Sequence, residues 1–238
     1  MNIADAPAGR SVFIAGTDTG VGKTRVTVSL LRALCGLRVR AMGMKPVATG
    51  ARSTPAGLRN ADAELIAAAG VAPAAYREVN PYCFADAVSP HIAAERVQTH
   101  IELACIRAAH EHLRTQAEIV VIEGAGGWLA PISAQHTMAD VALTLRASIV
   151  LVVGLRLGCL NHALLSAEAI LARGGEFAGW IGSAVDPAFE AASENIASLR
   201  QRLPGPQLAL LPFMPAPDDD LRHLTNFAAA LARIAQGP

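Results

Sequence analysis

Residues 13–24 read FIAGTDTGVGKT, and this stretch decides the fold. It ends like the phosphate-loop pattern G-x-x-x-x-G-K-[ST], in which backbone amides and a lysine surround phosphate oxygens. The pattern places a glycine five positions before Gly22, but this chain has Thr17 there. The glycine comes one position early, at Gly16, and Asp18 lies inside the loop. The stretch therefore raises two questions: whether it binds phosphate, and why its first glycine is displaced.

The surroundings of the stretch answer the first question. Residues 11–16 (SVFIAG) have the pattern of a buried strand, and residues 23–36 (KTRVTVSLLRALCG) have that of a helix closed by glycine. A strand, a glycine loop and G-K-T at the start of a helix form the context in which this motif binds phosphate. The alternative is a glycine turn that a threonine caps without any ligand. The context and the V-G-K-T core favour the phosphate loop.

Individual loop residues then have expected roles. Gly20 and Gly22 let backbone amides approach phosphate oxygens, and the start of the helix adds its partial positive charge. Lys23 would reach the outer phosphates, and the Thr24 hydroxyl would ligate Mg²⁺.

The whole chain alternates short β-branched runs with stretches rich in alanine and leucine. We expect strands near 11–16, 38–44, 118–123, 148–153, 178–184 and 207–211. We expect helices near 23–36, 61–70, 90–97, 101–116, 160–173, 189–203 and 222–235. Because such alternation implies parallel pairing, the sequence predicts a single α/β domain over residues 1–238. Its mostly parallel sheet would carry helices on both faces, as in phosphate-loop NTPases, and residues 45–90 would be irregular.

The composition excludes several classes of protein. Hydrophobic residues make up 52% of the 238 residues, which indicates a large packed core. The net charge is zero, so no nucleic-acid partner is expected. The longest apolar run, IVLVVGL at 149–155, is much shorter than the ~18 residues of a membrane helix. The opening MNIADAPAGR has no signal-peptide pattern, so we expect a cytoplasmic protein without a membrane partner and a flexible segment at 1–10.

Lysine is rare in this chain. Of the 20 basic residues 18 are arginine, and the remaining two are Lys23 and Lys45. A codon bias towards arginine explains the depletion but not which two positions kept lysine. Lysine is a compact charge on a flexible stem, whereas the planar guanidinium group is too large for a narrow phosphate pocket. The two lysines therefore indicate one shared site.

A phosphate loop also needs carboxylates for its metal, and the sequence offers two. Glu123 lies in IVVIEGAGG, at the carboxyl end of an expected buried strand and hence at the same edge of the sheet as the loop. Asp62, in LRNADAELI, could equally ligate the metal or be a charge in the first turn of a helix, and Asn60 is the expected cap of that helix.

Further motifs resemble those of one family. GTDTGVGKT is followed by KPVATG, NPYCF, SPHIAA, EGAGGW, LGCLNHALL and GWIGSAV. Their order and spacing are similar to those of dethiobiotin synthetases, from the first strand to about residue 185 and more weakly to about 215. The displaced glycine is itself typical of this family. The related partitioning ATPases and the nitrogenase iron protein carry a lysine inside the loop, where this chain has Asp18.

The resemblance implies an ATP- and Mg²⁺-dependent cyclo-ligase of biotin biosynthesis. Its substrates would be 7,8-diaminononanoate, CO₂ or bicarbonate, and ATP, and its products dethiobiotin, ADP and phosphate. One amine would take up CO₂ as a carbamate, whose oxygen attacks the γ-phosphate. The second amine would then displace phosphate from the carbamic–phosphoric anhydride. Because an anion attacks an anion, cations are needed to bring the two together.

The family pattern also assigns residues. Lys45 and Lys23 match catalytic lysines, and the metal-binding set would be Thr24, Asp62 and Glu123. ATP binding would involve Gly20, Val21, Gly22, Lys23, Thr24, Arg25, Asp62, Glu123, Gly124, Ala125, Gly126, Ser183, Ala184, Pro212, Phe213 and Met214. Substrate binding would involve Thr19, Lys45, Thr49, Leu160 and Asn161. The last two would come from the neighbouring subunit of a homodimer whose active site lies at the subunit interface.

One segment departs from the family. After GW many members have an asparagine that reads the adenine edge, whereas this chain has Ser183 and Ala184. A serine hydroxyl reads less of that edge than an amide. We therefore expect weak discrimination between ATP and other nucleoside triphosphates.

Two alternative functions share the phosphate loop. An amide ligase of the cobyrinate-diamide type usually carries an appended glutamine-hydrolysing domain, for which 238 residues leave no room. A partitioning-type switch ATPase would have the lysine inside the loop, and it gives no account of Lys45 or NPYCF. Phosphate release that needs diamine and bicarbonate, rather than a protein or DNA partner, distinguishes the synthetase from the switch.

Overall fold

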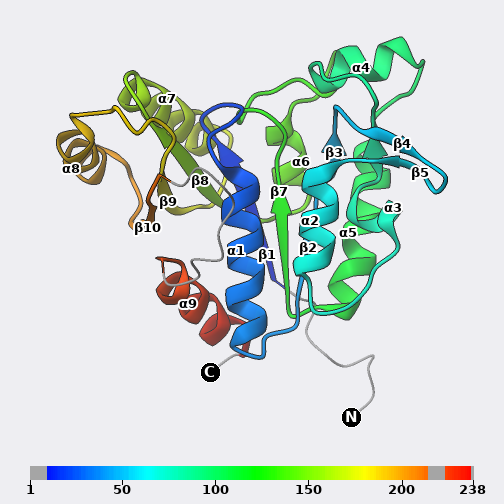
Figure 1. Cartoon of the computed structure of the whole chain (residues 1–238), viewed down its shortest axis with the longest axis horizontal. Helices are drawn as coiled ribbons and strands as arrows, with labels where there is room; N and C mark the ends of the chain where they lie inside the picture. Colours follow the sequence, from blue (N-terminus) through cyan, green and yellow to red (C-terminus); the bar gives the residue numbers. More distant parts are fainter. Residues whose placement is uncertain (1–9, 214–222, 237–238) are drawn as a thin grey trace.

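The computed structural model describes residues 10–213 and 223–236, and within these ranges a parallel six-stranded sheet forms the centre of the molecule (Figure 1). The strand order is β10-β9-β8-β1-β7-β2. The bounds are β1 (Arg10–Gly16), β2 (Ala41–Met44), β7 (Ile119–Glu123), β8 (Ser148–Leu155), β9 (Phe177–Ala184) and β10 (Gln207–Leu211). The predicted fold class is confirmed, and each of these strands overlaps a predicted one.

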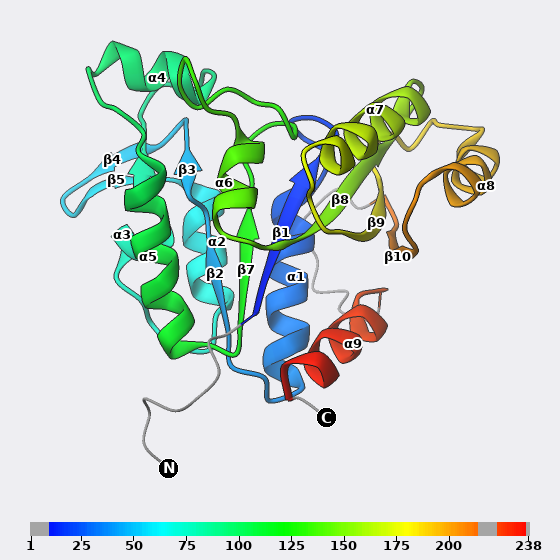
Figure 2. The same ribbon diagram turned by 180° about the vertical axis from the view of Figure 1, so that it is seen from behind.

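Alternate strand residues face two separate cores. In β1, Val12 and Ile14 belong to one buried cluster, while Phe13 and Ala15 belong to the other. The first cluster is completed by α1 (Lys23–Gly36), α2 (Ala61–Ala69) and α9 (Thr225–Gln236), which lie on the face towards the viewer in Figure 1. The second is completed by α5 (Leu103–Gln116), α6 (Met138–Thr144), α7 (Cys159–Ala172) and α8 (Ala192–Arg202), seen from behind in Figure 2. Both faces of the sheet are therefore covered, as the continuously apolar strands require.

Residues 45–90 contain more regular structure than the sequence predicts. Two small sheets lie there: β3 (Val47–Ala48) with β6 (Tyr82–Cys83), and β4 (Arg52–Thr54) with β5 (Gly57–Arg59). Helix α3 (Tyr76–Val79) was not predicted, and neither was α6, which lies further along the chain. Helix α4 (Pro90–Arg96) was predicted. The missed elements are at most seven residues long, too short to establish a periodic pattern.

The carboxyl ends of three neighbouring strands bring the chemically interesting residues together. In the parallel register Ile14 of β1 pairs with Glu123 of β7, and Met44 of β2 pairs with Ile122. The loop after β1, Glu123 at the end of β7 and Lys45 directly after β2 therefore meet at one edge, where such sheets bind ligands.

The chain ends add little to this picture. Arg10 already begins β1, while the remainder of the segment expected to be flexible, residues 1–9, lies outside the described residues. Among the described helices none is long and apolar enough to cross a membrane.

Candidate active site

The displaced glycine has a geometric reason. A Cβ atom at Gly16 would lie 2.9 Å from Cδ and Nζ of Lys23 and 2.9 Å from Cγ2 of Val21. Any larger residue would require Val21 and Lys23 to shift, because both side chains pack over the end of β1. The ammonium group of Lys23 donates a hydrogen bond to the carbonyl of Asp18 at 2.8 Å, which holds the lysine over the loop.

The start of α1 is open to an anion. Its N-cap is Gly22, with φ at 94°, and no side chain of the described residues caps the helix. The first amides of α1 are therefore available to phosphate oxygens, and the helix dipole favours an anion there. A Cβ atom at Gly22 would lie 2.7 Å from Oγ of Ser183, so close packing as well as the left-handed backbone favours glycine.

Asp18 ties the loop to the neighbouring strand connection. Its Oδ2 pairs with Nη2 of Arg156 at 2.6 Å, and its Oδ1 accepts a hydrogen bond from the amide of Thr19 at 2.7 Å. Arg156 follows β8, so this acid links the phosphate loop to the segment that leads into α7. The sequence left the role of Asp18 open, and the structure gives it this positional one.

Several polar groups meet at Glu123, which is only 1% exposed. The Thr24 hydroxyl donates to Oε1 of Glu123 at 3.0 Å, and the ammonium group of Lys45 donates to the same oxygen. The Lys45 ammonium group also lies 3.6 Å from Oδ2 of Asp62. Oε2 of Glu123 is buried without a hydrogen-bond partner among the described residues. Because an unpaired buried carboxylate oxygen is costly, this oxygen is suited to a cation.

These groups fit a nucleotide-bound Mg²⁺ ion. Mg²⁺ prefers oxygen ligands and is usually held by one or two carboxylates together with substrate phosphates and water. Thr24, Asp62 and Glu123 offer a hydroxyl and two carboxylates of this kind. Within the described ranges no group of three or more His, Cys, Asp or Glu could hold a metal, so those residues form no all-protein metal cage.

The backbone of Lys45 is fixed by the NPYCF segment. Nδ2 of Asn80 donates to the carbonyl of Lys45 at 2.7 Å and to that of Tyr82 at 3.0 Å. The amide of Lys45 donates to the carbonyl of Val79 at 2.7 Å. Asn80 thus positions the lysine. The NPYCF motif predicts no role for Asn80, because nothing in its pattern says which carbonyl the amide binds.

Lys23 is buried, and burial is the main reason that its pKa is lowered to about 8. The positive charge of Lys45 lowers the pKa further, while Glu123, Asp18 and Asp62 partly oppose the shift. Lys23 is therefore a cation below pH 8 and loses its charge as the pH rises through about 8. A phosphate at the loop would favour the charged form and raise this pKa.

We expect ADP binding to take up a proton through Lys23. The uptake attributable to this residue should be about half a proton per site at pH 8 and about nine tenths at pH 9, because a phosphate restores the charge. Calorimetry in two buffers of different ionisation enthalpy measures it. The control is the Lys23→Gln variant, titrated at a higher ADP concentration so that its sites are also filled. Equal proton uptake by the wild type and by this variant would contradict the prediction.

A single cavity of about 760 Å³, a size typical of small-molecule sites, is lined by Lys23, Thr24, Lys45, Asp62 and Glu123. Of the residues predicted from sequence it contains Thr19, Gly20, Gly22, Lys23, Thr24, Lys45, Thr49, Asp62, Glu123, Ala125 and Gly126. It also contains residues that were not predicted from the sequence to belong to the site: Ala48, Asn60, Ala87, Val88, Ser89, Pro90, Gly127 and Ala130. The SPHIAA motif, which begins with Ser89 and Pro90, was a signal for two of these.

Asn60 organises one wall of the cavity. Its side chain accepts a hydrogen bond from the amide of Ala63 at 3.2 Å, which makes it the cap of α2, as predicted. Its amide group donates to the carbonyl of Thr49 at 3.0 Å. One residue therefore fixes both the helix that carries Asp62 and the segment that carries Thr49.

The other described residues that were predicted to bind the nucleotide do not line this cavity. Val21 is fully buried, and Ser183 is buried against Gly22. The guanidinium group of Arg25 donates to the carbonyl of Pro212 at 2.7 Å, which places residues 212–213 beside the start of α1. Gly124 borders Lys45 through its carbonyl, Ala184 ends β9, Phe213 is exposed, and Met214 lies outside the described residues. Their contacts with a nucleotide stay predictions.

Leu160 and Asn161 also lie apart from the cavity of their own chain. They occupy the first turn of α7, whose N-cap is Gly158 with φ at 92°. No side chain of the described part of the chain caps this helix. The Cys159 amide donates to the carbonyl of Arg156 at 3.0 Å, which leaves the amides of Leu160 and Asn161 available to an anion. The substrate contacts predicted for the two residues stay predictions.

Comparison with known proteins places these features in context. The family description "AAA domain" (AAA_26) matches residues 10–219. An ATP-dependent dethiobiotin synthetase of Xanthomonas axonopodis pv. citri (strain 306) is 48% identical over 206 residues, covering 87% of this chain and 92% of that protein. The enzyme of the same name from Xylella fastidiosa (strain 9a5c) is 47% identical over 203 residues, covering 85% of this chain and 90% of that protein.

Solved structures resemble this chain in fold alone. The septum site-determining protein MinD of Pyrococcus horikoshii OT3, complexed with Mg-ADP, has a TM-score of 0.58 at 14% identity, covering 95% of this chain and 97% of that one. The MinD cell division protein of Aquifex aeolicus has a TM-score of 0.60 at 13% identity, covering 97% and 98%.

Proposed function

The chain belongs to the ATP-dependent dethiobiotin synthetases, within the AAA_26 domain family, and from this premise we propose how its cavity performs the reaction. It is an ATP-dependent cyclo-ligase that forms dethiobiotin in biotin biosynthesis. In our proposal the reaction takes place in the cytoplasm. Its substrates are 7,8-diaminononanoate, CO₂ or bicarbonate, and ATP. The observation that carries the proposal is the meeting of Lys45, Thr24 and Glu123 beside an uncapped phosphate loop.

The nucleotide would bind with its phosphates over residues 20–24. The free amides of α1 and the ammonium group of Lys23 would contact phosphate oxygens. Thr24, Asp62 and Glu123 would hold Mg²⁺, which neutralises negative charge on the phosphates when it is bound. Oε2 of Glu123, buried and unpaired among the described residues, supports this assignment.

Lys45 would act where the two anions meet. The first amine takes up CO₂ and loses a proton, and a carbamate oxygen then attacks the γ-phosphorus while ADP leaves. The second amine attacks the carbon of the mixed anhydride and loses a proton, while the C–O bond breaks and phosphate leaves with that carbamate oxygen. Two lysines on adjacent walls of one cavity supply the positive charge that lowers the repulsion between carbamate and γ-phosphate.

The diamine would lie along the less polar wall. Ala48, Ala87, Val88, Pro90 and Ala130 line the cavity and would accept an aliphatic chain. Thr19 and Thr49 line the same cavity and offer hydroxyl groups to the amines. A polar end with cations and an apolar wall suit a substrate whose amines react while its chain is only held.

We propose a homodimer in which α7 of one subunit completes the site of the other. Leu157, just before α7, is 89% exposed, and Leu165 within α7 is more than half exposed. Exposed leucines around an uncapped helix start fit an interface better than a solvated surface. The free amides of Leu160 and Asn161 would then hold the substrate carboxylate across the interface.

Subunit mixing tests this arrangement. Lys45→Gln and Asn161→Asp should each be nearly inactive alone, because the aspartate would place a negative charge beside the amides that bind the substrate carboxylate. In a mixed dimer one site would carry both changes and the other neither, so random exchange should restore about a quarter of wild-type activity. Activity is measured after co-incubation under exchange conditions. A mixture as inactive as its components would show that Asn161 does not act across an interface.

Selectivity among nucleotides is expected to be weak. Ser183 is buried, with 2% of its surface exposed, and it packs against Gly22. Positions 183–184 contain no asparagine, so the side-chain amide that would read adenine is missing there. We expect kcat/KM for ATP to exceed those for CTP and GTP by less than about a hundredfold. Initial rates with the three nucleotides measure this, and a larger preference for ATP would require another base-reading group.

The proposed function is tested by product formation. Purified protein with diamine, bicarbonate and MgATP should yield dethiobiotin, detected by mass spectrometry, with one phosphate per product. Omission of either diamine or bicarbonate should abolish phosphate release. Phosphate release that persists without them and rises with a protein or DNA partner would favour a switch ATPase instead.

A further inference from the structure

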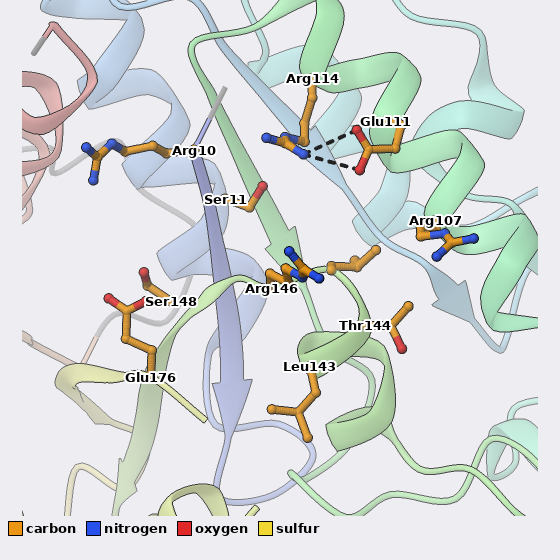
Figure 3. A pocket seen from close by; sticks show the side chains of 11 residues that line it. Arg10, Ser11, Arg107, Glu111, Arg114, Leu143, Thr144, Arg146, Ser148 and Glu176 are labelled. Atoms are coloured by element: carbon orange, nitrogen blue, oxygen red, sulfur yellow. Dashed lines mark hydrogen bonds and ion pairs between the residues drawn. The ribbon is translucent and has the colours of Figure 1, made fainter. Parts of the chain in front are cut away.

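A second cavity lies at the opposite edge of the sheet (Figure 3). Its volume is about 730 Å³. The walls are the first residues of β1 and β8, one side of α5, the turn after α6 and the turn before β9. It is separate from the site described above, because the phosphate loop follows the other end of β1.

The cavity gathers positive charge. Four arginines of the described residues line it, with two glutamates: Arg10, Arg107, Arg114, Arg146, Glu111 and Glu176. Arg114 is paired with Glu111, at 3.2 Å to both carboxylate oxygens. In the view of Figure 3, Arg146 lies between Arg10 on β1 and Arg107 on α5, and the side chain of Arg10 points away from Arg146. The charges of the lining residues sum to a net positive value, although the whole chain is neutral.

Three of these guanidinium groups are unpaired. Within the described ranges no hydrogen bond or ion pair joins the side chains of Arg10, Arg107 and Arg146 to another residue, and Glu176 neutralises none of them. Other described arginines do find carboxylates: Arg52 pairs with Glu64, Arg96 with Asp86 and Arg173 with Asp140. Three arginines without a partner among the described residues therefore line one hollow.

Hydroxyl groups accompany the arginines. Ser11, Thr144 and Ser148 line the same cavity, and the Ser11 hydroxyl is already hydrogen-bonded to Nε2 of His110 at 2.7 Å. Hydroxyl groups and guanidinium groups are both hydrogen-bond donors, and guanidinium groups bind phosphate or carboxylate with two parallel bonds. The lining therefore offers many donors and few acceptors.

We propose that this cavity binds a small oxyanion with at least two negative charges on phosphate or carboxylate groups. Arg10, Arg107 and Arg146 are exposed and would turn towards it from different walls, and the hydroxyl groups of Thr144 and Ser148 would bind its remaining oxygens. A hollow of this size encloses a small molecule, whereas DNA or a membrane would need a broad basic surface. The proposal does not depend on the synthetase reaction, since the two cavities lie at opposite edges.

The conformation of Arg146 provides a clean variant. Its φ is 49°, in the left-handed region that glycine prefers. Arg146→Gly should remove the guanidinium group while leaving the melting temperature equal or higher. Arg38→Gly is the matched control: Arg38 is exposed, follows a helix, has φ at 62° and lies outside the cavity.

The proposal is tested by calorimetric titration of three proteins: the wild type, Arg146→Gly and Arg38→Gly. Each is titrated with pyrophosphate and with citrate at matched ionic strength. Binding at the phosphate loop is common to all three proteins and cancels in the comparison. Arg146→Gly should weaken one binding event by at least about tenfold, whereas Arg38→Gly should leave it unchanged. An effect with pyrophosphate alone identifies a phosphate ligand, and an effect with citrate alone identifies a carboxylate ligand. Equal binding by all three proteins, or preference for a short DNA strand over both anions, would overturn the proposal.

Discussion

Replacing Lys45 with glutamine is expected to reduce kcat by at least about a thousandfold while changing the affinity for MgADP by no more than a few-fold. Glutamine has nearly the reach of lysine but no charge. In the proposed reaction the positive charge of Lys45 acts on groups that gain or transfer negative charge in the transition state. ADP lacks the γ-phosphate, so its binding should be nearly indifferent to the change.

Folding must be measured beside turnover in this variant. Lys45 is buried against Glu123, and loss of one partner of a buried ion pair typically costs about 3–5 kcal/mol. Thermal unfolding in the presence of MgADP shows whether the protein used in the assay is folded. Lys45→Arg is a second control, since it keeps the charge but not the compact shape. Turnover like that of the wild type in Lys45→Gln would show that Lys45 is not the catalytic lysine.

Replacing Lys23 with glutamine is expected to weaken MgADP binding by about a hundredfold and to lower kcat/KM by more. Lys23 is held over the phosphate loop by the Asp18 carbonyl, so its charge would act on bound phosphates before and during the reaction. The two substitutions should therefore have different effects. Lys45→Gln should lower mainly kcat, whereas Lys23→Gln should also weaken MgADP binding. Calorimetry with ADP and initial-rate kinetics measure the two effects.

The contrast between the lysines is the informative result. If Lys23→Gln bound MgADP normally, the phosphates could not lie where the loop and the start of α1 place them. If both variants lost binding equally, Lys45 would belong to the nucleotide site and the carbamate would need another cation.

The long elements of the fold could be predicted because each carries its own periodic pattern. Helix α1 begins at Lys23 and ends at Gly36, as predicted, and β8 follows a continuous apolar run. Helix α6 could not be predicted, since its seven residues give less than two full turns of pattern. The two-residue strands β3 and β6 depend on each other, and no local pattern marks them.

The candidate site could be predicted in part for a similar reason. Parallel strands bring their carboxyl ends to one edge, so Glu123 and the loop were expected to meet. The contact of Lys45 with Glu123 needed the neighbouring positions of β2 and β7 in the sheet, which the sequence does not give. The hydrogen bonds of Asn60 and Asn80 to the backbones of Thr49 and Lys45 depend on distant segments and were missed.

The central claim is that a carbamate oxygen attacks the γ-phosphate in the cavity that Lys45 and Glu123 line. The most direct test is one turnover with freshly added C¹⁸O₂, quenched before the label exchanges with water. We predict that the released phosphate contains one ¹⁸O atom for each dethiobiotin formed, because phosphate leaves with the carbamate oxygen. Unlabelled phosphate beside labelled dethiobiotin would contradict the account.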